Sequence, residues 1–149
     1  MKPLYYKGFL LIAFVFIVIF LNWFNHPNLQ YEGEKEVVGI SSNVDVYTDS
    51  FGVPHVFAKN EKDLFFTAGY LAARERLFQL SMVAILVKGE MALNLGDEYL
   101  DTDIFIRTWR IHETAKKMVL KMKPENKEVF NNFCDGINYR INEIKNDLP

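Results

Sequence analysis

The sequence has few of the residues that build disulfides, metal sites and catalytic triads. Cys134 is the only cysteine, which excludes an intrachain disulfide and a cysteine-based zinc site. The histidines His26, His55 and His112 do not stand at metal-ligand spacing. A Gly-x-Ser-x-Gly motif, which would indicate an α/β-hydrolase nucleophile, is absent. The net charge is −2 with acidic and basic residues intermixed, so we expect no nucleic-acid partner.

A long apolar run stands near the amino terminus. Residues 8–21 contain no polar side chain, and Trp23 and Phe24 extend the run. Its end lacks the small residues that signal peptidase needs, so the sequence favours an uncleaved signal anchor over a cleaved signal peptide. We therefore expect a transmembrane helix within residues 1–25, contacting the membrane through residues 8–24. The lysines before the run predict a single-pass protein of the inner or plasma membrane with its domain on the extracytoplasmic (periplasmic) side.

The remaining sequence predicts an α+β fold. Residues 26–40 are polar enough to form a connector, and residues 41–149 form the folded part. Apolar and polar residues alternate over residues 44–47, and after the turn residues Asp49-Ser50-Phe51-Gly52 the chain is expected to return as a second strand, which predicts a β-hairpin over residues 44–58. Asn60 is expected to cap the following helix, and Gly89 to end it. The expected helices cover residues 61–88, 90–95, 101–122 and 124–145.

The helix over residues 61–88 is predicted to turn one polar stripe to water. At 100° per residue this stripe contains Asp63, Thr67, Arg74, Ser81 and Lys88. The other faces are apolar except for Glu75, Arg76 and Gln79, which we therefore expect to be buried. A buried arginine needs an acidic partner, so Arg76 is predicted to pair with Asp101, Asp103 or a carboxylate beyond Pro149.

Two further residues are predicted to have structural roles. Gly69 stands one heptad before Arg76, where it would let another backbone approach closely. His55 lies in the hairpin and is expected to orient it through a hydrogen bond from a buried position, a role favoured over a direct part in catalysis. The acids Asp97, Glu98, Asp101 and Asp103 lack the spacing of a calcium loop, so helix capping is favoured over calcium binding.

Several segments, in this order, resemble the penicillin acylase family of N-terminal-nucleophile hydrolases. They are Asp49-Ser50-Phe51-Gly52-Val53-Pro54-His55, Gly69-Tyr70, Arg76-Leu77-Phe78-Gln79, Gly89-Glu90-Met91-Ala92 and Asp135-Gly136-Ile137-Asn138. The resemblance implies the first part of an αββα fold and hydrolysis of linear amides, such as a β-lactam side chain or an acyl-homoserine lactone. In this family the nucleophile is a serine that proteolysis, usually after a glycine, exposes as the first residue of a long chain.

No Gly-Ser dipeptide occurs in this sequence. The resemblance therefore implies that residues 41–149 are an incomplete, inactive amino-terminal part, without catalytic, cofactor-binding or metal-binding residues of its own. Its partner would be the remainder of the same polypeptide, and a complete enzyme of this family would allow a calcium site outside this chain. The alternative is a non-catalytic, membrane-tethered helical module that binds another protein. A stop codon after Pro149 would favour this alternative, and an open reading frame containing a Gly-Ser junction would favour the enzyme.

Overall fold

The computed structural model describes the backbone of residues 3–24 and 32–147, and the side chains of residues 8–20 and 32–145. The chain separates into two compact units, residues 1–36 and 37–149. Trp23 and Phe24, which extend the apolar run, lie outside the described side chains. The first part of the predicted connector, residues 26–31, also lies outside the described residues.

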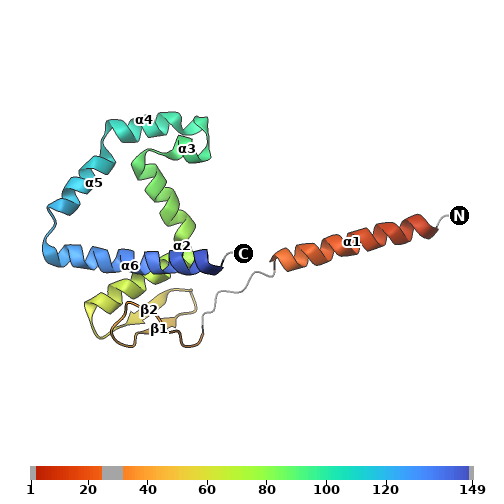
Figure 1. Ribbon diagram of the computed structural model, residues 1–149, viewed down its shortest axis with the longest axis horizontal. Helices are drawn as coiled ribbons and strands as arrows, with labels where there is room; N and C mark the ends of the chain where they lie inside the picture. Colours follow the sequence, from red (N-terminus) through yellow and green to blue (C-terminus); the bar gives the residue numbers. More distant parts are fainter. Residues whose placement is uncertain (1–2, 25–31, 148–149) are drawn as a thin grey trace. The chain divides into compact units, whose positions relative to one another are not determined.

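The first unit contains one helix, α1 (Pro3–Phe24), drawn in red and orange in Figure 1. Its described side chains are apolar, and most of them are exposed, for example Phe9, Phe14 and Phe16. A search of the described residues finds no helix that combines the length and the apolar character needed to cross a lipid bilayer. The predicted transmembrane helix is therefore not supported by the described residues.

The second unit begins with the predicted β-hairpin. Strands β1 (Asp45–Thr48) and β2 (Pro54–Phe57) pair antiparallel, with Val46 opposite Val56. The turn forms around Asp49, as its chemistry predicts, and Gly52 takes a positive φ of 79° that a side chain would disfavour. The prediction of a hairpin over residues 44–58 is confirmed.

Helix α2 (Glu61–Lys88) has the predicted boundaries. The side chain of Asn60 accepts a hydrogen bond of 2.8 Å from the backbone N–H of Asp63, which satisfies a donor of the first turn. Gly89 ends the helix in a left-handed conformation with φ 68°, and its N–H bonds back to the last turn. Arg76 breaks the regular backbone in the middle with φ −138° and ψ 28°, so α2 is kinked there.

Four shorter elements and one long helix complete the described part of the unit, and Figure 1 labels the helices α3 to α6 in green to blue. The prediction of one helix over residues 101–122 is wrong, because Arg110 adopts a left-handed conformation with φ 54° between two helices. The Arg107 side chain bonds to the Gly89 carbonyl at 2.9 Å, which holds the end of the first of them against the end of α2. The elements are α3 (Met91–Leu95), η1 (Asp97–Tyr99), α4 (Leu100–Thr108), α5 (Ile111–Leu120) and α6 (Pro124–Asp147).

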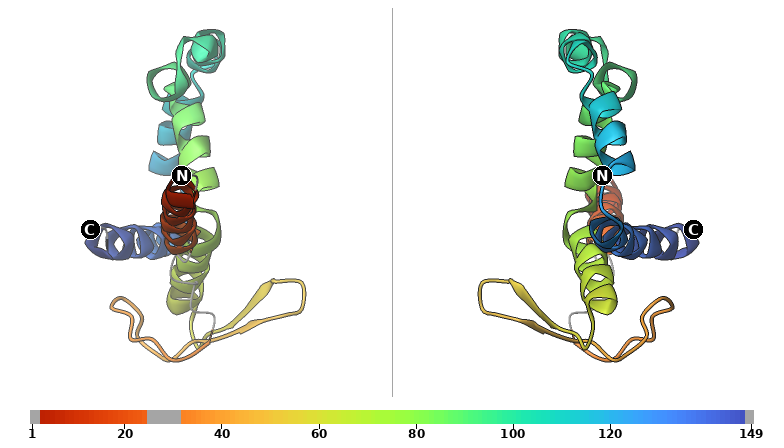
Figure 2. Two further views of the ribbon diagram at one scale, coloured as in Figure 1. Left: turned by 90° about the vertical axis from the view of Figure 1, so that its right-hand side faces the viewer. Right: turned by 90° about the vertical axis from the view of Figure 1, so that its left-hand side faces the viewer.

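The centre of the second unit is the crossing of α2 and α6, which both views of Figure 2 show. Gly69 of α2 lies against the Phe133 carbonyl, and Gly136 of α6 lies against the Phe66 carbonyl. A Cβ atom at either glycine would overlap these backbone atoms, so both helices need glycine here. The predicted close approach at Gly69 is confirmed. Among the described residues, the buried apolar side chains are only Phe66, Leu71 and Ala73.

Candidate functional site

Asp49 organises the turn of the hairpin. Its Oδ1 accepts hydrogen bonds of 2.9 Å from the backbone N–H groups of Phe51 and Val53. Its Oδ2 lies 3.1 Å from Nε2 of His55. The hydrogen bond from Val53, followed by that from His55, holds the pKa of Asp49 below its ordinary range. One carboxylate therefore fixes both ends of the turn.

His55 makes the hydrogen bond that the sequence predicts, but it is not buried. Its side chain is 53% exposed, and its partner Asp49 is also partly exposed. The hairpin has only two strands and lies open to solvent along most of its length, so it offers His55 no interior. An exposed pair of this kind orients the turn and adds little to stability.

Asp63 joins the segment before the hairpin to the start of α2. It is fully buried, and its carboxylate accepts hydrogen bonds from the backbone N–H groups of Ser41 and Ser42 and from the side chains of Ser41 and Asn60. Burial raises the pKa of Asp63, but these hydrogen bonds outweigh it and hold the pKa below the ordinary value. The sequence placed Asp63 on the solvated stripe, which is wrong.

The polar residues in the middle of α2 lie on faces opposite to those predicted. Glu75, Arg76 and Gln79 are exposed, whereas Arg74 is only 13% exposed and bonds to Glu75 at 2.7 Å. The prediction that these three side chains are buried is therefore wrong for the described structure. The irregular backbone at Arg76 means that the 100° spacing does not carry the face of Gly69 on to Arg76 and Gln79.

Of the four acidic residues expected to cap helices, Asp103 does so, at the start of α3. The buried carboxylate of Asp103 accepts hydrogen bonds of 2.8 and 2.9 Å from the N–H groups of Met91 and Ala92, the first residues of α3. Asp103 therefore does not pair with Arg76. Within the described part of the chain, no group of histidine, cysteine, aspartate and glutamate residues is arranged to hold a metal ion.

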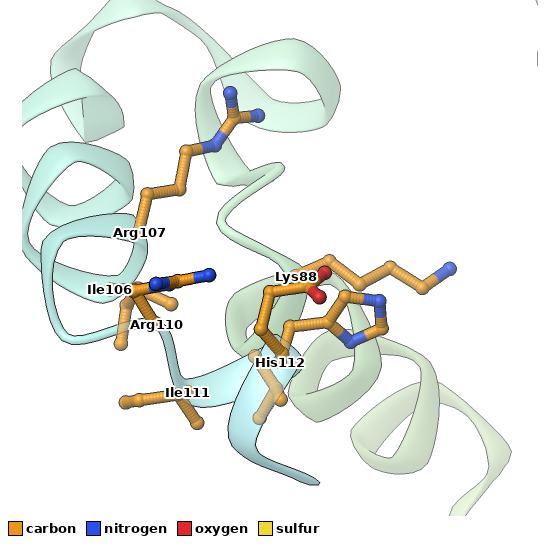
Figure 3. Close-up of a pocket in the computed structure, with 8 residues that line it drawn as sticks. Lys88, Ile106, Arg107, Arg110, Ile111 and His112 are labelled. Carbon is orange, nitrogen blue, oxygen red and sulfur yellow. The ribbon is translucent and has the colours of Figure 1, made fainter. Parts of the chain in front are cut away.

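A small pocket of about 200 Å³ lies where α2, α4 and α5 meet (Figure 3). Its basic residues diverge: Figure 3 shows the Arg107 side chain extending away from Arg110, and Arg107 bonds to Gly89. The carboxylate of Glu113 also lines the pocket. Its basic groups therefore do not converge on a single point where an anion could bind.

A larger groove of about 870 Å³ lies between the hairpin and α2. We call it the hairpin–α2 groove. It brings together the three polar residues that sequence reasoning singled out on α2, beside apolar residues of both elements. Its lining consists of Gly52, Val53, Pro54, Val56, Ala68, Leu71, Ala72, Glu75, Arg76, Phe78 and Gln79. The lining combines apolar side chains with the charged residues Glu75 and Arg76, and it contains no histidine, serine or cysteine that could act as base or nucleophile.

Residues 43–149 match the family model described as penicillin amidase. The chain belongs to the penicillin amidase family. The segments of the resemblance noted above, from the hairpin to Asn138 on α6, lie inside this match. The predicted absence of catalytic residues from this chain stays a prediction.

Curated relatives and a solved structure carry the same family names. The chain is 29% identical over 104 residues to penicillin G acylase of Escherichia coli, covering 70% of this chain and 12% of that protein. It is 26% identical over 117 residues to the acyl-homoserine lactone acylase QuiP of Pseudomonas putida, covering 78% and 14%. Its fold resembles the thermostable penicillin G acylase of Alcaligenes faecalis, with a TM-score of 0.63, 30% identity, and coverage of 72% of this chain and 58% of that one.

Sequence reasoning missed the burial of Asp63 in this penicillin amidase family member, and it expected Asp103 to cap a helix without identifying which one. Asp63 had a usable signal, since it stands three residues after the capping Asn60, where a side chain returns to the start of the helix. Asp103 had a weaker one, because it reaches a helix eleven and twelve residues earlier in the chain. Glu75, Arg76 and Gln79, which the sequence singled out on α2, all line the hairpin–α2 groove and are exposed, not buried in a core.

Proposed function

We propose that this chain is the amino-terminal segment of an acylase that hydrolyses linear amides. The observation that carries the proposal is the match of residues 43–149 to the penicillin amidase family. The relatives are named for acylases that act on a penicillin or on an acyl-homoserine lactone, and both of these substrates are linear amides. A β-lactam side chain or an acyl-homoserine lactone is therefore the proposed substrate class.

The reaction itself is assigned to a serine outside this chain. In an N-terminal-nucleophile hydrolase, the free α-amine of that serine takes the proton of its own hydroxyl, and the oxygen attacks the amide carbonyl. An acyl-enzyme forms, the amine leaves, and water releases the acid. Within this proposal the present chain supplies the scaffold: Asp49 fixes the hairpin, Asp63 the start of α2, and Asp103 the start of α3. Any calcium site of the complete enzyme is likewise placed outside this chain.

We also propose that residues 8–24 attach the protein to the inner or plasma membrane with residues 32–149 on the extracytoplasmic side. The support is the sequence, in which residues 8–21 lack polar side chains, and the exposure of the described apolar side chains of α1. Apolar side chains exposed along a helix gain free energy when lipid covers them. Carbonate extraction of membranes tests this attachment: the chain should stay in the pellet, and a soluble chain of full mass would overturn it.

An amidase assay tests the enzymatic proposal. The full chain is purified alone, and separately from cells that express its gene together with the downstream DNA. Both samples are incubated with a phenylacetyl and a long-acyl chromogenic amide. We expect no turnover by the chain alone and turnover in the second sample.

The proposal would be overturned if the chain alone showed turnover and this turnover disappeared when every serine was changed to alanine. Such a result would place the nucleophile among Ser41, Ser42, Ser50 and Ser81. The absence of turnover in both samples would favour the non-catalytic interaction module.

A further inference from the structure

Helix α5 is amphipathic, but the second unit does not bury its apolar face. At about 100° per residue, four apolar residues of α5 fall on one face, and they are Ile111, Ala115, Met118 and Val119. A globular domain usually turns such a face towards its core. Yet no residue of α5 is buried, and Met118 is 65% and Val119 47% exposed. Within the part of the chain that the structure describes, this apolar face is therefore left open to solvent.

Lysines lie on both sides of the apolar face of α5. Residues 116–123 contain four lysines and no acidic residue, although the whole chain has a net charge of −2. All four lysines are exposed, and they are Lys116, Lys117, Lys121 and Lys123. The same helical spacing places Lys116 and Lys121 on opposite sides of the apolar face. Lys116 lies 3.5 Å from Glu113, an exposed pair that holds the lysine only weakly.

We propose that α5 is a membrane-surface helix, with Met118 and Val119 in contact with lipid and the flanking lysines on the phosphates of anionic headgroups. A basic amphipathic helix with an exposed apolar face is typical of such a contact. Lysine suits it because the alkyl stem lies along apolar surface while the ammonium group reaches the headgroups. The inference rests on the proposed membrane attachment, which supplies the bilayer. Attachment of the same chain through residues 8–24 would also raise the effective concentration of lipid around α5.

A fluorescent label on the apolar face tests the contact with lipid. The full chain, expressed from its gene with the downstream DNA, carries Cys134→Ser to remove its exposed cysteine and Met118→Cys to accept the polarity-sensitive dye NBD. It is reconstituted in vesicles of phosphatidylcholine alone, or of equal parts of phosphatidylcholine and phosphatidylglycerol. Leu93→Cys on α3 is the matched control, because Leu93 is also apolar and is 83% exposed.

We expect nitroxide-labelled lipid to quench the dye at position 118 in the vesicles with phosphatidylglycerol, and added salt to weaken this quenching. The dye at position 93 should stay open to acrylamide, a quencher dissolved in the water. If acrylamide quenches the dye at position 118 as strongly as the dye at position 93, the proposal is wrong. It is also wrong if neither quencher reaches position 118, because another polypeptide segment would then cover the face.

Removing charge tests the lysines. Changing Lys116, Lys117 and Lys121 to glutamine should lower the ratio of lipid-exposed to water-exposed dye at position 118 by about a hundredfold, or roughly fivefold for each lysine. The matched control changes three exposed lysines outside α5, which are Lys59, Lys62 and Lys127, and it should leave the ratio nearly unchanged. Equal effects of the two triple variants, or equal lipid quenching without phosphatidylglycerol, would overturn the assignment of the lysines to anionic lipid.

Carbonate extraction of the same vesicles separates this inference from the proposed attachment. A chain that stays in the pellet while position 118 remains in water would overturn the contact through α5 and leave the attachment through residues 8–24 in place. A full-mass chain that carbonate releases, although lipid quenched position 118 before the extraction, would overturn the attachment and leave the contact through α5.

Discussion

Adding one methyl group at the crossing of α2 and α6 should destabilise this protein strongly. A Cβ atom at Gly69 would overlap the backbone carbonyl of Phe133, and one at Gly136 would overlap the carbonyl of Phe66. Backbone of a packed helix cannot rotate away as a side chain can, so the two helices must move apart along the whole crossing. Overpacking of a core costs about 1–3 kcal/mol, and a backbone clash belongs at the upper end, about 3 kcal/mol.

That cost is large for this unit. Phe66, beside the crossing, is one of only three buried apolar side chains among the described residues, and its ring packs edge-on to Tyr139 at 5.8 Å. Moving the helices apart would loosen this contact as well. With a urea dependence of about 1–3 kcal/mol per molar for a small protein, the Gly69→Ala midpoint should fall by about 1–3 M.

Pulse proteolysis of the full chain across a urea series measures this midpoint, because only unfolded molecules are cleaved during the pulse. Gly8→Ala is the matched control, since no atom lies within 4 Å of a Cβ at Gly8 and its φ is not positive. Gly69→Ala combined with Gly136→Ala should cost less than the sum of the single changes, because one separation of the helices relieves both clashes. A midpoint for Gly69→Ala equal to that of the control would refute the close crossing.

Three further outcomes are expected. Asp63→Ala should lower the free energy of unfolding, measured by urea titration, by about 2–3 kcal/mol, because it leaves buried N–H groups unpaired. The pKa of Asp63 lies below its ordinary value of 3.8, so the stability that its carboxylate contributes should be present above pH 3.8 and lost as the pH falls below that value. A stability that does not change with pH in this range would contradict the assignment. Asp49→Ala should speed hydrogen exchange at the N–H of Val53, measured by NMR, and unchanged exchange would remove the carboxylate from the turn. Arg74→Ala should destabilise the isolated chain, measured by thermal unfolding, more than Arg76→Ala, whose cost should stay within about 0.5 kcal/mol. The reverse order would support the sequence-based prediction that Arg76 is buried and Arg74 is exposed.

The sequence alone was sufficient to predict the hairpin, helix α2 and the family, because these features depend on residues that are close together in the chain. Asn60 and Gly89 mark the two ends of α2 because a capping side chain and a left-handed glycine act on the nearest turn only. The hairpin follows in the same way from Asp49 and Gly52, whose hydrogen bonds and positive φ involve residues at most six positions apart. The order of short motifs along the chain was sufficient to indicate the penicillin amidase family, which the family match confirms.

Tertiary structure alone decided the faces of α2 and the break at Arg110. Periodicity assumes a regular helix, so it could not predict the exposure of Arg76, where the backbone is irregular. The near-burial of Arg74 was likewise visible only in the structure. The burial of Asp63 depends on Ser41 and Ser42, more than twenty residues away, and the end of α4 depends on the bond from Arg107 to Gly89. These outcomes rest on contacts between segments far apart in the chain, and a sequence pattern contains no record of which segments meet.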